Sequence, residues 1–382
     1  MTEKLFKKIH ELNDAYVKVW QEVCEIESPT SSKAGVDAVG EYFKALARKK
    51  GWKIDVFPEE RAGDVVVITM NDGAKGTPVA LSGHMDTVHP IGMFGYPAVK
   101  IDGDRICGPG VRDCKGGVVA GFLAMDALKE CGFTDRPVVM YLQSDEEGGG
   151  KYSGDRTIGR ICEAAQGSAA FLNLEGGSSD SLTLFRKGIA SFEFTVTGIE
   201  AHSAHCATMG ANAILEAAYK IIELEKFKDN DGLTVSCTVI NGGTVHNTVP
   251  GKCKFIANAR FATAKQLDEF SEFAKKLASE VKVKGCSTEV VLPRIRPAME
   301  PCEKNDTLLA RLNEIWQENG LSPLAAGTAT GGSDAANASC AGLAAVDGLG
   351  VYGGDIHSIK EYALISSLAH QAKRIALAVC HL

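Results

Sequence analysis

The sequence predicts an α/β protein with a mixed, mostly parallel sheet flanked by helices, and with a small ferredoxin-like α+β domain inserted into it. The 382 residues are too many for one typical hydrophobic core, so two domains are expected. Strand-like and helix-like segments alternate near both ends of the chain, whereas the middle is richer in alternating, β-type segments. We therefore expect a discontinuous domain over residues 1–186 and 300–382, and an inserted domain over residues 187–299.

The larger domain is predicted element by element from apolar periodicity. Residues 1–50 favour helices because apolar residues recur at three- and four-residue spacing. Short apolar runs bounded by glycine or acidic residues favour strands. The remaining elements expected in this domain are strands within 65–70, 78–87, 137–147 and 169–177, and helices over 116–131, 305–320 and 361–379.

The inserted domain has its own order of elements. An alternating run, "GIASFEFTVTGI", precedes the helical segment "ANAILEAAYKIIELEKF". Two further alternating stretches, a second helical segment, "AKQLDEFSEFAKKLASEV", and a last strand follow. The order strand, helix, strand, strand, helix, strand indicates one compact α+β unit.

Composition excludes several kinds of partner. The net charge of −7 disfavours nucleic acid and anionic membranes, which both require a basic face. No apolar run approaches the roughly 20 residues of a membrane span, and the first residues lack the apolar core of a secretory signal. Twelve cysteines occur without CxxC pairs, which favours reduced thiols and a cytoplasmic protein.

Acidic and imidazole side chains stand just after several of the predicted strands. Ligands bind at the carboxyl ends of strands in open α/β sheets, so these side chains are expected to share one site. Two histidines and three carboxylates suffice for two divalent metal ions, and a further glutamate beside them can act as a base. The residues are His84, Asp113, Glu146, Glu147 and Glu175, with His357 far downstream.

Two of these positions have structural alternatives. His84 and Asp86 alternate in "SGHMDT", so the carboxylate could hold the second nitrogen of a metal-bound imidazole, but the same pair could form a surface turn. Asp113 lies in the glycine-bracketed turn "GPGVRDCKGG", where it could bridge two cations or cap a helix that begins at Lys115.

Each of the remaining positions also admits a structural explanation when it is considered alone. The adjacent acids of "SDEEGGG" repel one another unless a cation is near, although a solvated acidic turn is the alternative. Glu175 follows an apolar run and therefore needs a partner if it is buried. His357, in "GGDIHSIKEY", could be purely structural. The prediction depends on the order in which these residues occur together.

That order resembles the dinuclear-zinc peptidases and deacylases, a family that includes aminoacylase, acetylornithine deacetylase, succinyl-diaminopimelate desuccinylase, peptidase T and glutamate carboxypeptidase. The resemblance extends over nearly the whole chain. It rests on the motifs already quoted and on "NLEGG", "AHSAHCATMGANAI", "NGGTVHNTVP", "NARF" and "GGSDA".

The resemblance implies two metal ions, zinc in the first place, with cobalt or manganese as alternatives. It implies that His84 and Glu175 bind one ion, that Glu147 and His357 bind the other, and that Asp113 bridges them. It further implies that Glu146 is the general base and that Asp86 orients His84. Residues 1–186 and 300–382 would then form the catalytic domain.

The resemblance also implies roles for the inserted domain, 187–299, as a lid and as the contact of a homodimer. His202, eight residues before Gly210, would stabilise the oxyanion in the partner subunit's site, although it and its neighbour His205 could be plain turn residues. The other implied contacts are Asn247, Arg260 on a substrate carboxylate, and Gly332 along the substrate. From the residues alone, Arg260 could equally be salt-bridged within a strand.

The expected function is metal-dependent hydrolysis of the amide bond of a small peptide or N-acyl amino acid by a water that bridges the metals. One alternative is deacylation of N-acyl amino acids or diamines. Another is a metal-binding interaction protein without catalysis, and a third is a thiol enzyme that uses Cys114. Cys107 and Cys114 flank the Asp113 turn, but the histidine and carboxylate set is complete without them.

Overall fold

The computed structural model describes residues 2–382, which divide into two compact units. The large unit comprises residues 2–184, Pro301–Thr328 and Ser333–Leu382. The small unit comprises Phe185–Glu300 and the short segment Ala329–Gly332, whose return to this unit was not predicted.

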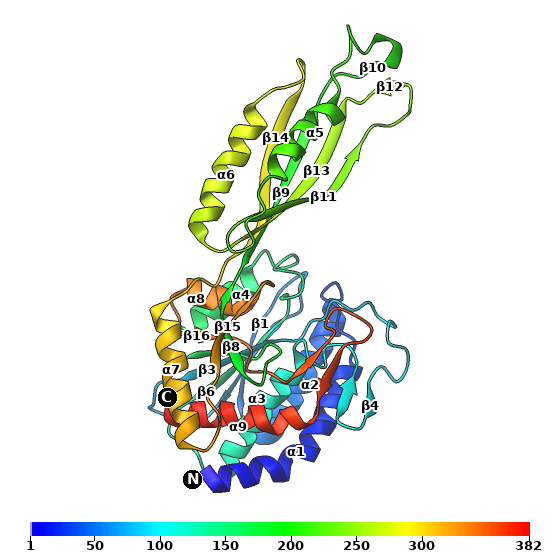
Figure 1. Cartoon of the computed structure of the whole chain (residues 1–382). Coiled ribbons are helices and arrows are strands. Elements are labelled where there is room, and N and C mark those ends of the chain that lie inside the picture. Colours follow the sequence, from blue (N-terminus) through cyan, green and yellow to red (C-terminus); the bar gives the residue numbers. More distant parts are fainter. Residues whose placement is uncertain (1) are drawn as a thin grey trace. The chain divides into compact units, whose positions relative to one another are not determined.

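A six-stranded mixed sheet forms the centre of the large unit (Figure 1). Its strand order is β1-β2-β6-β3-β7-β16. The pairings among β6, β3, β7 and β16 are parallel, whereas β1 and β2 run antiparallel to their neighbours. Every residue of β2 and β3 is buried, as their apolar sequences require. The predicted fold class is therefore confirmed. The strands are β1 (Lys53–Phe57), β2 (Val65–Met70), β3 (Val79–His84), β6 (Val138–Gln143), β7 (Phe171–Asn173) and β16 (Ala345–Val346).

The helix α3 (Lys115–Glu130) packs on β3 and β6 and is covered in turn by α1 (Thr2–Glu25) and α9 (Ser366–His381). Nearly all of its residues are buried, because it is enclosed by the sheet and the two outer helices. Its first turn approaches β7 closely: a Cβ atom at Gly117 would lie 1.9 Å from the carbonyl oxygen of Leu174. Glycine therefore lets the turn that carries Asp113 lie beside the strand end that carries Glu175.

Other elements complete the large unit. The helix predicted over 361–379 was placed too early, because Tyr362–Leu364 form β18, which pairs with β5 (Arg105–Cys107), and α9 begins at Ser366. The Ser366 backbone N–H donates to Asp104 Oδ1 at 2.7 Å, which satisfies one group at the helix start. The remaining elements are α2 (Lys33–Lys50), β4 (Lys100–Asp102), α4 (Arg156–Ala164), β8 (Ser181–Arg186), α7 (Glu303–Glu318), β15 (Ala325–Ala329), α8 (Asp334–Cys340) and β17 (Gly353–Gly354).

The small unit contains a four-stranded antiparallel sheet of order β11-β13-β9-β14, against which two helices pack. Its elements follow the predicted order strand, helix, strand, strand, helix, strand, which is the ferredoxin-like arrangement. It has its own core, in which Phe194 and Phe255 stack at 4.7 Å between ring centroids. The elements are β9 (Gly188–Thr197), β10 (Ala201–His202), η1 (Ser203–His205), α5 (Ala213–Leu224), β11 (Thr234–Gly242), β12 (Thr248–Val249), β13 (Lys252–Phe261), α6 (Ala264–Ser279) and β14 (Ser287–Arg296).

Candidate metal centre

His84 is the last residue of β3, where the strand ends and its side chain is buried. Its Nδ1 lies 2.9 Å from the backbone oxygen of Asp86 and 3.5 Å from Oδ1 of the same residue. The opposite nitrogen, Nε2, faces Asp113 Oδ1 at 3.1 Å and Glu175 Oε1 at 3.5 Å. His84 and Asp86 are 1% and 0% exposed, which excludes a surface turn.

Asp113 lies between the two histidines. Its Oδ1 faces His84, and its Oδ2 lies 3.3 Å from Nε2 of His357. Burial alone would raise the pKa of Asp113, but hydrogen bonds with His357 and His84 lower it well below the usual range. The alternative role as a helix cap is wrong, because Cys114 occupies the N-cap of α3.

Glu147 and His357 form the second half of the cluster. His357 Nε2 lies 3.2 Å from Glu147 Oε2. Hydrogen bonds with Asp113 and Glu147 raise the pKa of His357 to about 10. Burial raises the pKa of Glu147 to about 8 despite its contact with His357. His357 has φ of 61°, so its turn holds a backbone conformation that residues with a side chain rarely adopt.

Glu175 follows β7, and its carboxylate lies close to His84 and Cys114. Burial raises its pKa well above the usual range, and the charge of Asp113 adds to the effect. Ligand atoms of His84, Cys114 and Glu175 lie within 4.8 Å of one another, as do those of His84, Asp113 and Glu147. Burial raises the pKa of the Cys114 thiol, which disfavours the thiolate that a metal or a nucleophilic mechanism would need.

Asp86 organises the turn after β6. Its Oδ1 accepts from the Glu146 backbone N–H at 3.3 Å, and its Oδ2 accepts from the Glu147 backbone N–H at 3.0 Å and from the Thr30 hydroxyl at 2.7 Å. Burial would raise the pKa of Asp86, but its hydrogen bonds, that with His84 first among them, lower it. Glu146 is only 5% exposed, so the acidic turn is not the solvated one considered as an alternative.

The donor set fits divalent cations. Two donors that are each about 2.1 Å from one tetrahedral ion lie about 3.4 Å apart, and the nitrogen–oxygen distances of 3.1 to 3.5 Å agree with this spacing. Within the described part of the chain, the buried Oε1 of Glu147 has no hydrogen-bond partner. Carboxylates with raised pKa values beside charged histidines are stabilised when a cation takes the place of their protons.

The predicted residues of the small unit are not gathered into a cluster of this kind. His202 and Asn247 are both exposed. Their segments lie side by side, since the Ser203 backbone N–H donates to the Asn247 carbonyl at 2.8 Å. Nδ1 of His202 accepts from the Ala204 backbone N–H at 3.2 Å. Arg260 lies on β13, half-buried, and donates to the Thr330 carbonyl at 3.4 Å.

The sequence reasoning missed Arg296. Arg260 and Arg296 both pair with Ile189, from β13 and β14, so they lie on the same face of the sheet. Burial lowers the pKa of Arg260, and the nearby charge of Arg296 lowers it further. A Cβ atom at Gly332 would lie 2.8 Å from Nε of Arg296, so this glycine lets the segment approach the guanidinium. The pattern of arginines at 294 and 296, two residues apart in a strand, could have indicated this face.

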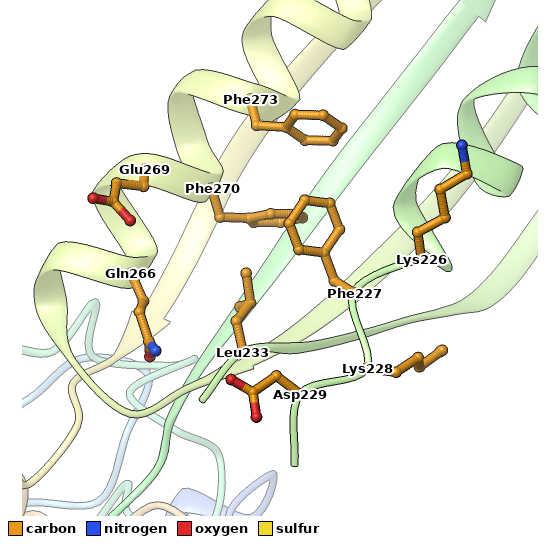
Figure 2. A pocket seen from close by; sticks show the side chains of 9 residues that line it. All are labelled: Lys226, Phe227, Lys228, Asp229, Leu233, Gln266, Glu269, Phe270 and Phe273. Carbon is orange, nitrogen blue, oxygen red and sulfur yellow. The ribbon is translucent and has the colours of Figure 1, made fainter. Parts of the chain in front are cut away.

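A hollow of about 650 Å³ lies beside α6 in the small unit. Figure 2 shows the rings of Phe227, Phe270 and Phe273 gathered at its centre, with charged side chains around them. None of the predicted site residues lines it.

No helix among residues 2–382 is long and apolar enough to cross a membrane.

An α/β sheet whose strand ends bring His84 together with several buried carboxylates, and a turn that adds His357, are features of the class of metal-dependent hydrolases. Residues 80–381 match the family described as Peptidase family M20/M25/M40, and the chain belongs to that family. It is therefore a hydrolase of the metallopeptidase type, which confirms the resemblance inferred from the motifs.

Similar proteins carry related names. The chain is 28% identical over 371 residues to carboxypeptidase G2 of Pseudomonas sp. (strain RS-16), covering 95% of this chain and 88% of that protein. It is 26% identical over 333 residues to a probable succinyl-diaminopimelate desuccinylase of Staphylococcus aureus (strain MRSA252), covering 76% of this chain and 78% of that protein. The solved structure of the YXEP protein of Bacillus subtilis, titled a dinuclear metal binding peptidase from the M20 family, has a TM-score of 0.70 at 15% identity and covers 97% of this chain and 98% of that chain.

Proposed function

We propose that this protein uses two divalent ions to release an amino acid that bears a free carboxylate from a small peptide or an N-acyl amino acid. The observation that carries the proposal is the position of Asp113, whose two oxygens face His84 and His357 at 3.1 and 3.3 Å. One carboxylate between two imidazoles is the arrangement expected of a bridging ligand. The Bacillus subtilis protein is described as a dinuclear metal binding peptidase, which supports the proposal of two ions.

The five ligands divide into two pairs around Asp113. His84 and Glu175 approach each other at 3.5 Å and would hold one ion. Glu147 and His357 approach each other at 3.2 Å and would hold the other. Histidine and carboxylate donors accept zinc, cobalt and manganese, and we propose zinc because the family resemblance favours it.

The ions, when bound, polarise the scissile carbonyl and lower the pKa of a water toward ~7. Glu146 accepts the proton of the attacking water and then delivers it to the leaving nitrogen. The backbone at Glu146 is fixed by Asp86, which also lies against His84, so this aspartate positions both the base and a ligand. The base is thus held on the same turn as the ligand Glu147.

The small unit supplies the groups that select and stabilise the substrate. Arg260 binds the free carboxylate, and Arg296 on the same sheet face adds positive charge. His202 donates a hydrogen bond to the oxyanion of the tetrahedral intermediate, and Asn247 and Gly332 contact the substrate. The exposure of His202 and Asn247 suits residues whose partner is a substrate.

We also propose that the small unit forms a homodimer. α5 carries exposed apolar residues at helical spacing: Ile214, Leu215, Tyr219 and Ile222. β11, an edge strand of the sheet, exposes Val239 and Ile240. An apolar helix face and an open strand edge from two copies can pair symmetrically, and such a dimer would let His202 serve the partner subunit.

The function is tested with a panel of dipeptides, glutamyl conjugates, N-acetyl amino acids and N-succinyl amino acids, with metal content measured on the same preparation. We expect turnover of substrates with a free carboxylate, and loss of turnover when a chelator removes the metal. Turnover that persists after complete metal removal, and stops on thiol alkylation, would contradict the proposal in favour of a thiol enzyme.

Deacylation is the second candidate, favoured by the desuccinylase among the similar proteins. The two candidates share the chemistry at the amide bond and differ in the group on the acyl side. Faster turnover of N-succinyl diamines than of any peptide in the panel would favour the deacylase. A non-catalytic metal-binding protein would turn over no substrate with both ions bound.

A further inference from the structure

A buried carboxylate lies four residues after His357, outside the proposed ligand set. Glu361 is 1% exposed, and its Oε1 accepts from the backbone N–H groups of Arg112 at 2.9 Å and Asp113 at 3.1 Å. Its Oε2 accepts a longer bond from the Gly110 N–H at 3.4 Å. Burying a carboxylate is costly unless it is well paired, so this side chain is committed to the turn that carries Asp113.

His89 is the side-chain partner of this carboxylate. Its Nε2 lies 2.7 Å from Glu361 Oε2, both residues are buried, and the His89 ring meets the Phe94 ring edge-on at 5.0 Å. His89 follows Asp86 by three residues along the chain. Glu361 therefore connects three segments: the one after Asp86, the turn at Asp113 and the one after His357.

These are three of the segments that carry the proposed ligands and their supports. Asp113 has to present one oxygen to His84 and the other to His357 at the same time. Its own backbone N–H is held by Glu361, so a shift of that carboxylate moves both oxygens together. Sites of this kind depend on ligand placement to within about 0.5 Å.

We infer that Glu361, with His89, is a positioning residue that fixes Asp113 between the two histidines and so sets the affinity for the metal pair. The inference rests on the proposed function, because it assigns Asp113 the bridging place. Glu361 touches no proposed ligand atom and acts only through the backbone of the turn. Partners behind the ligands of metal sites typically change metal affinity by about 10- to 100-fold when they are removed.

The chain offers a matched control in Asp126, on α3 of the same unit. It is also 1% exposed, and it accepts from the Tyr16 hydroxyl at 3.1 Å and pairs with Lys50. None of these partners is a proposed ligand or lies on the Asp113 turn. Asp126→Asn therefore reports what the loss of a buried carboxylate does to stability alone.

The experiment compares wild type with Glu361→Ala, Glu361→Gln and Asp126→Asn. Zinc affinity is measured by competition with a chelating dye, ion count by elemental analysis, and melting temperature on the metal-free proteins. We expect about 100-fold weaker zinc binding for Glu361→Ala and about tenfold for Glu361→Gln. The glutamine has a single acceptor oxygen, which can face either the Arg112 and Asp113 N–H groups or His89, but not both sides at once. Asp126→Asn should lower the melting temperature and leave zinc affinity unchanged.

The inference is overturned if the Glu361 variants bind zinc within about twofold of wild type. If Glu361→Ala does not fold, the zinc affinity of Glu361→Gln alone provides the test. It is also overturned if Asp126→Asn weakens zinc binding as much as they do, because the effect would then follow stability. If wild type itself fails to bind two ions, the proposed function fails. Two ions in wild type with unchanged Glu361 variants leave that function standing and remove only the role of Glu361.

Discussion

The two units place their predicted functional residues in opposite ways. In the large unit, the five proposed ligands come from five separate stretches of chain, yet their donor atoms approach to 3.1–3.5 Å around buried Asp113. In the small unit, His202 and Asn247 are exposed, and the Nδ1 atom of His202 accepts a hydrogen bond from the Ala204 backbone N–H. Clustered charges need a scaffold that keeps them in place, whereas groups that meet a substrate can remain in solvent until it binds.

The largest effect is expected at the proposed base, Glu146, which belongs to the buried cluster of the large unit. Glu146→Gln should lower kcat by about 10²–10⁴-fold, because the amide cannot accept the proton of the attacking water. The two ions should remain bound, since Glu146 is not a proposed ligand. Steady-state kinetics and elemental analysis on one sample check this result, and near-wild-type kcat with both ions present would assign the base elsewhere.

A slightly smaller effect is expected at His202 in the small unit. His202→Ala should lower kcat by about 10²–10³-fold, as the loss of one oxyanion donor does, with no change in metal content. His205→Ala is the matched control, since His205 is an exposed neighbour in the same turn. Equal losses for both histidines would show that the turn as a whole, and not His202, matters.

Mixing variants tests whether His202 serves its own subunit or the partner. Dimers reassembled from equal amounts of His202→Ala and Glu146→Gln chains should recover about a quarter of wild-type activity if His202 acts across the dimer. About half of the dimers are then mixed, and each mixed dimer has one complete site of two. Activity no higher than the sum of the separate variants would place His202 in its own subunit or remove the dimer.

A third effect is expected at Arg260 and concerns binding. Arg260→Ala should raise KM by about 10- to 100-fold for substrates with a free carboxylate, the cost of a charge-assisted hydrogen bond. The same substrates with the carboxylate converted to an amide should show little further change. An unchanged KM for the free acids would remove this role and shift attention to Arg296.

The last effect concerns metal affinity and not turnover, and it is a pH dependence that belongs to the large unit alone. In the metal-free protein the pKa values of about 8 for Glu147 and about 10 for His357 mean that both hold protons at pH 7. Metal binding displaces these protons, so affinity should rise as pH rises, by about tenfold per pH unit for each proton released. The slope should fall above pH 8 and again above pH 10, as Glu147 and then His357 lose their protons.

Calorimetry at several pH values, in buffers of different ionisation enthalpy, measures both the affinity and the protons released. An affinity that is constant between pH 6 and 8 would contradict the charge states inferred for this pair.

Sequence patterns predicted the layers and the proximity of most residues in the proposed metal centre, because strand ends in an open sheet converge by geometry. His84 and Glu175 follow β3 and β7, which are neighbours in the sheet, so their proximity follows from strand order. The position of His357 depends instead on a turn with positive φ, and nothing in the periodicity specifies it. The company of the other candidate residues singled out His357 in the sequence, and the motif resemblance then implied its role as a ligand.

Other features could not be predicted from the sequence, because they depend on contacts between distant turns and loops. Glu361 stands at the start of a segment predicted to be helical, and its contacts with Arg112 and Asp113 arise from a turn that is distant in sequence. The contact of Arg296 with Gly332 requires the segment 329–332 to return to the small unit. Long-range returns of short loops leave no periodic pattern to be found in one sequence.

The most direct test is the number of zinc ions bound by the protein and by Asp113→Ala, measured by elemental analysis after equilibrium dialysis. Two ions per chain in wild type, and the loss of both in the variant with its fold intact, is the expected result. Wild type that retains one ion or none after equilibration, or an Asp113→Ala protein that still holds two, would contradict a paired metal centre bridged by this aspartate.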